Sequence, residues 1–547
     1  MLYTRPCMRR MCWMFWAAAV LSAGLLELPF PIAGPLPPWR SIFAWFALAP
    51  LLWAILSPAA APAKHPLRRA FLLAYLCGVL WYIGNCYWIY NTMLMYGDLP
   101  RWVAALLLVG FSLVLGLYFG LFGLAVKLVH RAAGLRLALA AAPFFWVAVE
   151  LAGARITCVP WDQLGYSQVD NALVNQLAPW TGVYGISFVL IAVNALIAAA
   201  LLVPKPRFKI ACGLSGAALT LAGTAGIFLN PPAPAPAAVA DLIQPNLNVG
   251  ADNDWTGATW TAHMAQLAGL ASRSCGPSIP GIPQITHGLI APLCPSPPIP
   301  PALAAWPESP APFFQADPRL IPALGSIARS IHAPLVVGAI GMDYSGSSWH
   351  DYNSALVVGA DGNLIGRYDK IHLVPFGEYV PFANLLTFAH KLTGRVSRFD
   401  RGAERSTFFL NGHRYGVFIC YEAVFADEVR LFALHGAQVF VNISDDGWYG
   451  DTSAPWQHLN MARMRAIENR RWLLRDTNNG VTASIDPYGR VRQSIARHQT
   501  GTLAAGFAFN SRITFYTAHG DVFAWLCAIL TMGLVGFSLE SGLRPKR

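Results

Sequence analysis

Long apolar runs constrain the fold of this 547-residue chain more than any other feature. An α-helix needs about 20 predominantly apolar residues to cross the hydrocarbon core of a bilayer. The runs predict an α-helical membrane domain of seven helices over residues 1–230 and one further membrane helix, followed by a basic tail, within residues 520–547. They fall at about 12–30, 41–58, 70–94, 102–127, 137–154, 181–203, 209–229 and 521–539.

The composition agrees with a membrane protein, because 55% of the residues are hydrophobic and only 12% are charged. Soluble domains carry about 25% charged residues. The net charge of +11 has the sign of a nucleic-acid-binding protein, but the basic residues form short clusters at the ends of apolar runs. Such clusters set membrane topology, so we expect no nucleic-acid partner.

The basic clusters also orient the predicted helices. They precede the first run and follow every second run after it, up to the C-terminal tail. Lys and Arg collect on the cytoplasmic side of membrane proteins. Both termini are therefore expected in the cytoplasm and residues 231–519 outside it, which requires an even number of helices, as counted.

Residues 231–519 carry the pattern of a mixed α/β domain. Strand-like segments lie at 239–246, 333–341, 354–360, 437–444 and 480–489, and a helical pattern covers 455–471. Strands interleaved with helices predict a sheet covered by helices.

A Pro-rich stretch at 275–302 has no periodicity and is predicted to be an irregular insertion. Cys275 and Cys294 bracket it. In an oxidising compartment these two residues could form a disulfide, and the sequence leaves open whether they do. The ten cysteines of the chain show no CxxC pair and no Cys/His metal spacing, so no metal site is expected.

The segment 412–425 contains a strand pattern that ends at Cys420, followed directly by a helical pattern. A cysteine at such a junction lies near amide donors and the positive end of a helix dipole, both of which favour the thiolate. The alternative is that Cys420 is a small buried apolar residue.

Two other segments favour a reactive Cys420. The segment 303–312 contains a short apolar strand that ends in Trp306, Pro307 and Glu308, and the segment 367–381 places Lys370 and Glu378 around a Pro-Phe-Gly turn. A carboxylate, an amine and a thiol at strand ends suit acyl transfer through a thioester. Glu308 would accept the thiol proton, and Lys370 would stabilise the oxyanion and lower the pKa of the thiol.

This combination resembles the nitrilase superfamily and, more narrowly, its membrane branch, the apolipoprotein N-acyltransferase family. The resemblance covers most of the chain, and the motifs occur in the family's order. It implies a nitrilase-like α-β-β-α sandwich for residues 231–519, on the periplasmic side of a bacterial inner membrane. The matching motifs are WPES (306–309), YDKIHLVPFGEYVP (368–381), ICYE (419–422), ISDDGWYG (443–450), PWQHLNMARMRAIE (455–468) and LLRDTNNG (473–480).

The resemblance implies roles for individual residues. Glu308, Lys370 and Cys420 match the base, the amine beside the oxyanion and the nucleophile. The family more often has Asn-Asp-Ala where this chain has Asp445-Asp446-Gly447, which puts the contacts of that loop in doubt. The supporting residues implied are Glu378, Glu422 and Tyr421, and the substrate-binding residues are Trp255, Asn353, Trp448 and Tyr449.

The implied function is N-acylation of lipoproteins. A fatty acyl chain would pass from a phospholipid to the thiol, and then to the α-amino group of the diacylglyceryl-modified N-terminal cysteine of an apolipoprotein. The kinetics would be ping-pong. The resemblance implies no cofactor, and we expect a monomer.

Three alternatives remain open at this point. A membrane-tethered amidase would hydrolyse the thioester with water. A transporter or receptor would need several buried charges at mid-membrane, and the apolar runs offer little beyond Glu150. A Cys-His pair would use His372 or His458.

Two features of the membrane domain concern its outer side. Glu150 lies late in the fifth apolar run, close to Arg155, and a structural ion pair between them is expected. The loop 158–168 that follows is aromatic and polar, resembles the acyltransferase family, and could line the lipid entrance.

Overall fold

The computed structural model describes residues 5–58, 64–97, 99–232, 234–248, 257–272, 301–308, 313–345, 348–375, 377–379 and 399–543. Trp255, Cys275 and Cys294 lie outside these ranges, as does residues 275–300 of the predicted insertion. The substrate-binding role of Trp255, the insertion and the disulfide therefore stay predictions.

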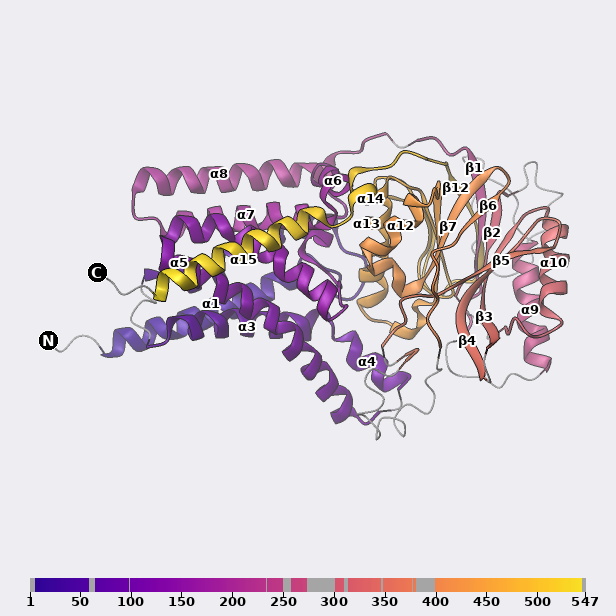
Figure 1. The fold of residues 1–547 in the computed structure, drawn as a ribbon, viewed down its shortest axis with the longest axis horizontal. Helices are drawn as coiled ribbons and strands as arrows, with labels where there is room; N and C mark the ends of the chain where they lie inside the picture. The colour runs from indigo at the N-terminus through magenta and orange to yellow at the C-terminus, as the bar shows by residue number, and fades with distance from the viewer. Residues whose placement is uncertain are drawn as a thin grey trace.

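A bundle of long apolar helices forms one end of the molecule, and an α/β domain forms the other (Figure 1). Both chain termini lie at the end of the bundle remote from the α/β domain. Within the described residues, six helical stretches are long and apolar enough to cross a membrane. The bundle helices are α1 (Arg5–Glu27), α2 (Ala49–Leu56), α3 (Pro66–Asn85), α4 (Trp88–Met95), α5 (Arg101–Ile156), α7 (Val183–Leu202), α8 (Pro206–Ala225) and α15 (Val522–Leu543).

Two of the predicted apolar runs differ from single straight helices, and two others share one broken helix. The second run is a 3-10 helix, η1 (Pro38–Trp45), that continues as α2. The third run is split, because α3 ends at Asn85 and α4 is a separate helix. The 56-residue α5 is broken at Gly134, which has φ 86° and ψ 176°, so it contains both the fourth and the fifth run. Glycine accepts this φ because it has no Cβ.

The α/β domain contains two six-stranded sheets, ordered β12-β1-β2-β3-β4-β5 and β11-β10-β9-β8-β7-β6. In each sheet the inner strands run parallel, β1-β2-β3 and β7-β8-β9, and the outer pairs are antiparallel. The strands are β1 (Ala238–Gln244), β2 (Leu303–Ala305), β3 (Leu335–Ser345), β4 (Ser348–Val358), β5 (Leu364–Asp369), β6 (Thr407–Leu410), β7 (His413–Ile419), β8 (Val439–Ser444), β9 (Leu473–Thr477), β10 (Thr482–Ile485), β11 (Val491–Ile495) and β12 (Gly501–Phe507).

Helices cover both outer faces of the paired sheets, which gives four layers (Figure 1). Helices α9 (Gly257–Ala271) and α10 (Leu320–Ile331) cover the first sheet on the side away from the bundle. Helices α12 (Ala426–Leu434) and α13 (Ala454–Asn469) cover the second sheet and face the bundle. This is the α-β-β-α order that the resemblance implies. The shorter helices are η3 (Leu164–Gln168), η4 (Val174–Leu177), α6 (Ala178–Thr181), η5 (Gly226–Phe228), η6 (Cys420–Val424), η7 (Asp446–Tyr449) and α14 (Phe515–His519).

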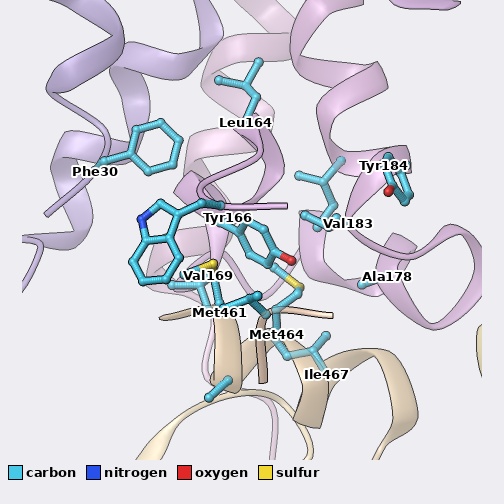
Figure 2. Close-up of a cluster of buried hydrophobic side chains, with 14 of the residues drawn as sticks. Phe30, Leu164, Tyr166, Val169, Ala178, Val183, Tyr184, Met461, Met464 and Ile467 are labelled. Carbon is cyan, nitrogen blue, oxygen red and sulfur yellow. The ribbon is translucent and has the colours of Figure 1, made fainter. Parts of the chain in front are cut away.

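Helix α13 joins the α/β domain to the bundle and is buried almost throughout. Its Met461, Met464 and Ile467 pack in one cluster with Tyr166 and Val183 of the bundle (Figure 2). Burial of apolar surface in such a contact stabilises the folded protein by about 25 cal/mol per Å².

Polar side chains of α13 also bond to the bundle. The Gln457 amide donates to the Asn85 backbone oxygen and side-chain oxygen, both at 3.0 Å. The Arg465 guanidinium donates to the Tyr166 hydroxyl at 2.8 Å. A helix that looks half polar in sequence is therefore buried on both sides.

The predicted Glu150–Arg155 ion pair is wrong. The Glu150 carboxylate instead accepts hydrogen bonds from the Trp146 indole and the Leu164 backbone N–H, both at 2.8 Å. Arg155 forms ion pairs with Asp427 and Asp521 of the α/β domain and its C-terminal extension. Residues five apart on a helix do not face each other, whereas residues three or four apart do.

Candidate active site

Cys420 lies where strand β7 ends and the 3-10 helix η6 begins. Its side chain is buried, with the residue 4% exposed. Its backbone φ is +47°, in the left-handed region that residues with a Cβ rarely adopt. The predicted strand-to-helix junction is confirmed.

A buried ion-pair cluster lies at the ends of the first-sheet strands. Lys370 directly follows β5, and Glu308 lies three residues after β2. The Lys370 Nζ atom is 2.8 Å from Glu308 Oε1 and 2.9 Å from Glu378 Oε1. We call Glu308, Lys370 and Glu378, with Asn353, the lysine cluster.

Asn353 of β4 completes the lysine cluster. Its side-chain nitrogen donates to Glu308 Oε1 at 2.8 Å and to Glu378 Oε1 at 2.6 Å. Its backbone oxygen accepts from the Lys370 N–H at 2.8 Å. Both amide hydrogens of Asn353, which was predicted to bind substrate, are thus engaged by the carboxyl groups.

Glu308 and Lys370 keep their charges at neutral pH. Burial raises the pKa of Glu308, but the attraction of Lys370 and hydrogen bonds from Lys370, Cys420 and Asn353 outweigh it, so that pKa lies below its usual range. Burial lowers the pKa of Lys370, but Glu308 and Glu378 raise it well above its usual range. Glu308 is therefore ionised and able to accept a proton.

The Cys420 thiol has the opposite tendency. Burial, with the nearby Glu308 carboxylate, raises the pKa of Cys420 well above its usual range, although Lys370 and a hydrogen bond with Ser444 act to lower it. The expectation of a resting thiolate is wrong. Lys370 acts in the predicted direction, but the five-residue η6 and one lysine do not overcome desolvation.

The Glu422 carboxyl group accepts hydrogen bonds from backbone N–H groups and from a tyrosine hydroxyl. Its Oε1 accepts from the Tyr368 hydroxyl at 2.8 Å and from the Ile371 N–H at 2.7 Å. Its Oε2 accepts from the Ile419 N–H at 2.8 Å. Glu422 therefore ties the end of β7 to the segment that follows Lys370.

The loop after β8 supports Glu308 from the second sheet. The Asp445 N–H donates to Glu308 Oε2 at 3.0 Å. The Asp445 carboxyl group accepts from the Gly447 N–H at 3.0 Å and from the Asn478 amide at 3.1 Å. The Asp445 carboxyl group, at the position where the family more often has asparagine, therefore still has hydrogen-bond partners.

Aromatic side chains of the bundle surround the next residues. The Tyr421 ring stacks on Trp161 with centroids 6.4 Å apart. Tyr449 is buried and lies edge-on to Trp88 at 5.3 Å, whereas Trp448 is partly exposed and lies against the Tyr96 ring at 5.2 Å. The Trp161 indole donates to Gln457 at 2.9 Å.

A pocket between the bundle helices has Trp161 in its lining. Most of its lining is aromatic or aliphatic. Its lining residues are Leu26, Trp81, Tyr82, Tyr118, Phe119, Trp146, Val149, Glu150, Gly153, Val159, Trp161, Asp162, Gln163 and Leu164.

The two histidines of the Cys-His alternative contact groups other than the Cys420 thiol. The His372 ring stacks on Phe425 at 4.2 Å, and its Nε2 is 3.5 Å from the Glu428 carboxylate. The His458 Nε2 lies 3.0 Å from the backbone oxygen of Cys420, not from its thiol. Among the described residues, no group of three or more His, Cys, Asp or Glu side chains could hold a metal ion.

Comparison with known proteins identifies the family. Residues 10–196 match the apolipoprotein N-acyltransferase N-terminal domain, and residues 293–512 match carbon-nitrogen hydrolase. The apolipoprotein N-acyltransferase of Geobacter metallireducens is 35% identical over 523 residues, which cover 93% of this chain and 92% of that protein. This chain belongs to the apolipoprotein N-acyltransferase family.

Further members of the apolipoprotein N-acyltransferase family match over a similar length. The protein of Allorhizobium ampelinum is 28% identical over 538 residues, covering 94% of this chain and 95% of its own. Among solved structures, Saccharomyces cerevisiae Nit3, a member of branch 10 of the nitrilase superfamily, matches 52% of this chain and 95% of its own, with 16% identity and a TM-score of 0.36.

The sequence did not predict the roles of several residues of the site. Asp445 and Asp446 were noted only as a departure from the family's loop, and His458 only as a member of a Cys-His pair. Asp446, His458 and Arg475 form a second buried cluster beside Cys420, and Asp445 supports Glu308 through its backbone. All four residues lie in motifs shared with the apolipoprotein N-acyltransferase family. The motifs marked the segments but not the partners within them.

Proposed function

We propose that this chain is an apolipoprotein N-acyltransferase that moves a fatty acyl chain from a phospholipid to the N-terminal amine of a lipoprotein. The observation that carries the proposal is a buried thiol, Cys420, beside the ion-paired carboxylate Glu308. Both lie in an α/β domain whose α12 and α13 layer meets the apolar bundle. Lipid substrates and a thiol nucleophile then share one side of the molecule.

The first half-reaction forms a thioester. At rest Glu308 is ionised and the thiol is protonated, so proton transfer accompanies the attack of Sγ on the ester carbonyl carbon. Lys370 stabilises the developing oxyanion; one such donor typically contributes about 3–4 kcal/mol. The C–O bond to the glycerol then breaks, and the leaving lysophospholipid oxygen takes the proton from Glu308.

The second half-reaction transfers the acyl chain. The α-amino group of a diacylglyceryl-modified cysteine attacks the thioester carbon, and Glu308 accepts its proton. The C–S bond breaks, the sulfur takes that proton back, and the N-acylated lipoprotein leaves. Because the lysophospholipid leaves before the amine enters, the kinetics are ping-pong.

The supporting residues keep this geometry fixed. Asn353 holds Glu308 at 2.8 Å and Glu378 holds Lys370 at 2.9 Å, so the base is in position before the substrate binds. Three backbone N–H groups donate to Glu422, which ties the end of β7, directly before Cys420, to the segment that follows Lys370. Neither Glu378 nor Glu422 needs to exchange a proton.

We place the acyl chain in the aromatic pocket of the bundle. Its Trp161 wall stacks on Tyr421, next to the nucleophile, and its other walls are Trp81, Phe119 and Trp146. An apolar chain entering from the bilayer would reach Sγ along this path. Trp448 and Tyr449 would bound the same space from the loop after β8.

We also propose eight membrane crossings with both termini in the cytoplasm and the α/β domain in the periplasm. The break at Gly134 supports two crossings within α5, and α1 adds one to the long apolar helices. The termini lie together at the end remote from the α/β domain (Figure 1). The site uses residues of one chain, so we propose an active monomer.

The test is to trap and map the acyl-enzyme. The purified protein with labelled phospholipid should form a hydroxylamine-labile adduct that mass spectrometry locates on Cys420. Cys420→Ser should form none, and Cys212→Ser, which changes a free cysteine on α8, should behave like the wild type. After a diacylated lipopeptide is added, free fatty acid without N-acylated peptide would show a hydrolase instead. An adduct on another residue would overturn the proposal.

A further inference from the structure

We infer that His458, held by Arg475 of the buried Asp446–Arg475 ion pair, is a positioning residue that fixes the backbone of the nucleophile Cys420. The inference rests on the proposed function, because it assigns a role in the same reaction. It concerns the backbone carbonyl of Cys420, which the lysine cluster does not contact. We call Asp446, His458 and Arg475 the arginine cluster.

The geometry points from α13 to the strained residue. His458 is fully buried, and its Nε2 lies 3.0 Å from the Cys420 carbonyl oxygen. Its Nδ1 lies 3.0 Å from Asp446 Oδ1 and 3.1 Å from an Arg475 guanidinium nitrogen. The ring therefore connects the nucleophile's backbone to a buried ion pair.

The proton positions follow from the partners. A carbonyl oxygen can only accept, so His458 Nε2 carries the hydrogen. A guanidinium can only donate, so Nδ1 accepts from Arg475. Burial, followed by the positive charge of Arg475, lowers the pKa of His458 despite Asp446, so the ring is neutral at physiological pH. A neutral ring with its hydrogen on Nε2 donates to Cys420 without being available as the reaction base.

The arginine cluster is rigid because its charges are matched. The Arg475 guanidinium donates to both Asp446 oxygens, at 2.9 and 2.8 Å. The Ser444 hydroxyl donates to Asp446 Oδ1 at 3.0 Å. Burial raises the pKa of Asp446, but the positive charge of Arg475 outweighs it and holds that pKa far below its usual range, so the carboxylate stays ionised.

Cys420 requires such support because its φ of +47° is unfavourable for a residue with a Cβ. The hydrogen bond from His458 to the Cys420 carbonyl oxygen orients the peptide that follows Cys420, and through it the direction of Sγ. Ser444 links the same cluster to the thiol itself. If His458 no longer bonded the carbonyl, Cys420 could relax and Sγ would move away from Glu308.

A matched pair of amide variants separates this role from general stability. In His458→Gln the amide nitrogen is as many bonds from Cβ as Nε2 and can still donate to Cys420. In His458→Asn the amide reaches only the Arg475 side. We expect His458→Gln to acylate within about threefold of the wild-type rate and His458→Asn to be about 30-fold slower at unchanged KM, because a displacement of about 1 Å can cost 10²-fold.

A second readout does not depend on acyl transfer. Cys420 alkylation by iodoacetamide, followed by mass spectrometry, should change in His458→Asn and stay near wild type in His458→Gln. This comparison holds even if the protein transfers no acyl chain, so failure of the proposed function is distinguishable. His435→Gln, which changes an exposed histidine at the end of α12, is the control.

Equal rates for the two amide variants, or a loss confined to KM, would overturn the inference. If the His458 variants do not fold, Asp446→Asn tests the same support of the Cys420 backbone without changing the imidazole ring. We expect it to slow acylation about tenfold and to change Cys420 alkylation, in line with loss of one supporting interaction. Unchanged alkylation in that variant would also overturn the inference.

Discussion

Two buried ionic clusters flank Cys420, and they differ in composition and in what they contact. In the lysine cluster, two carboxyl groups, Glu308 and Glu378, share one ammonium group. In the arginine cluster, one carboxylate and one guanidinium match each other. The first cluster contacts the thiol side of Cys420, and the second contacts its backbone carbonyl.

The difference shows how a buried site separates reactive from supporting charges. Glu308 has a carboxylate next to a protonated thiol, so a proton can move between them during reaction. The arginine cluster holds Asp446 firmly ionised and His458 neutral, so its protons stay in place. We expect variants of the first cluster to lose chemistry and variants of the second to lose stability and geometry.

The largest effect is expected from Glu308→Gln, which keeps the shape of the side chain and removes the proposed base. The rate of acyl-enzyme formation should fall by about 10²–10⁴-fold, the usual contribution of a general base. Glu404→Gln, on the exposed surface, should leave the rate unchanged. A Glu308→Gln enzyme that acylates at the normal rate would break the comparison, because the proton would then have another acceptor.

Lys370→Met should follow closely. It removes the oxyanion donor, with an expected loss of about 10²–10³-fold in rate. It also leaves Glu308 and Glu378 buried without their cation, which should lower stability by about 3–5 kcal/mol, measured by thermal unfolding in detergent. Lys209→Met, an exposed lysine, is the control; equal losses in both variants would contradict this role.

Arg475→Met tests the second cluster. Removal of one partner of a buried ion pair should cost about 3–5 kcal/mol of stability. The folded fraction should keep a base of normal pH dependence, because Glu308 is untouched. A shifted pH profile with unchanged stability would show that the two clusters do not divide the work as described.

The pH dependence of Cys420 alkylation is a smaller, directional effect. Because the pKa of the thiol is raised by burial, the alkylation rate should keep rising with pH beyond the ordinary thiol pKa of about 8.5, without a plateau there. Lys370 opposes that shift, so Lys370→Met should move the profile to still higher pH. A plateau below pH 8 would mean that the thiolate is favoured at rest.

The smallest effect is expected where the bundle contacts the loop after β8, one residue beyond Asp446. The Tyr96 hydroxyl donates to the Gly447 backbone oxygen at 2.7 Å, between the α4 region and the loop after β8. Tyr96→Phe should cost about 0.5–1.5 kcal/mol of stability, the net value of one hydrogen bond, with little change in rate. A rate loss as large as that of Lys370→Met would extend the active site into the bundle.

The sequence grouped Glu308, Lys370 and Glu378 because each lies at a strand end or in the loop after it, within a recognisable motif. Asn353 lies inside β4 and outside these motifs, and the sequence predicted it to bind substrate instead.

The sequence did not predict the arginine cluster. Asp446, His458 and Arg475 are separated along the chain and meet because β8 pairs with β9 in parallel, with Asn442 opposite Arg475. That register is a tertiary property, and no local pattern encodes it.

The sequence was also silent on what covers each helix. The polar residues of 455–471 are typical of a helix with one face in water, yet α13 is buried between the second sheet and the bundle. Likewise, a thiolate seemed favoured at the Cys420 junction because hydropathy does not report how completely a side chain is desolvated. Burial decided the direction of the Cys420 pKa.

The close seat of α13 on the bundle has a consequence for the lipids themselves. Met461 and Met464 pack against the helices while Gln457 and Arg465 bond to them, so the sandwich is locked to its anchor (Figure 2). If the bundle crosses the membrane as proposed, it also fixes the height of the Cys420 sulfur relative to the bilayer midplane. Membranes of unsuitable thickness would hold the donor's ester at the wrong level, and turnover should track bilayer thickness.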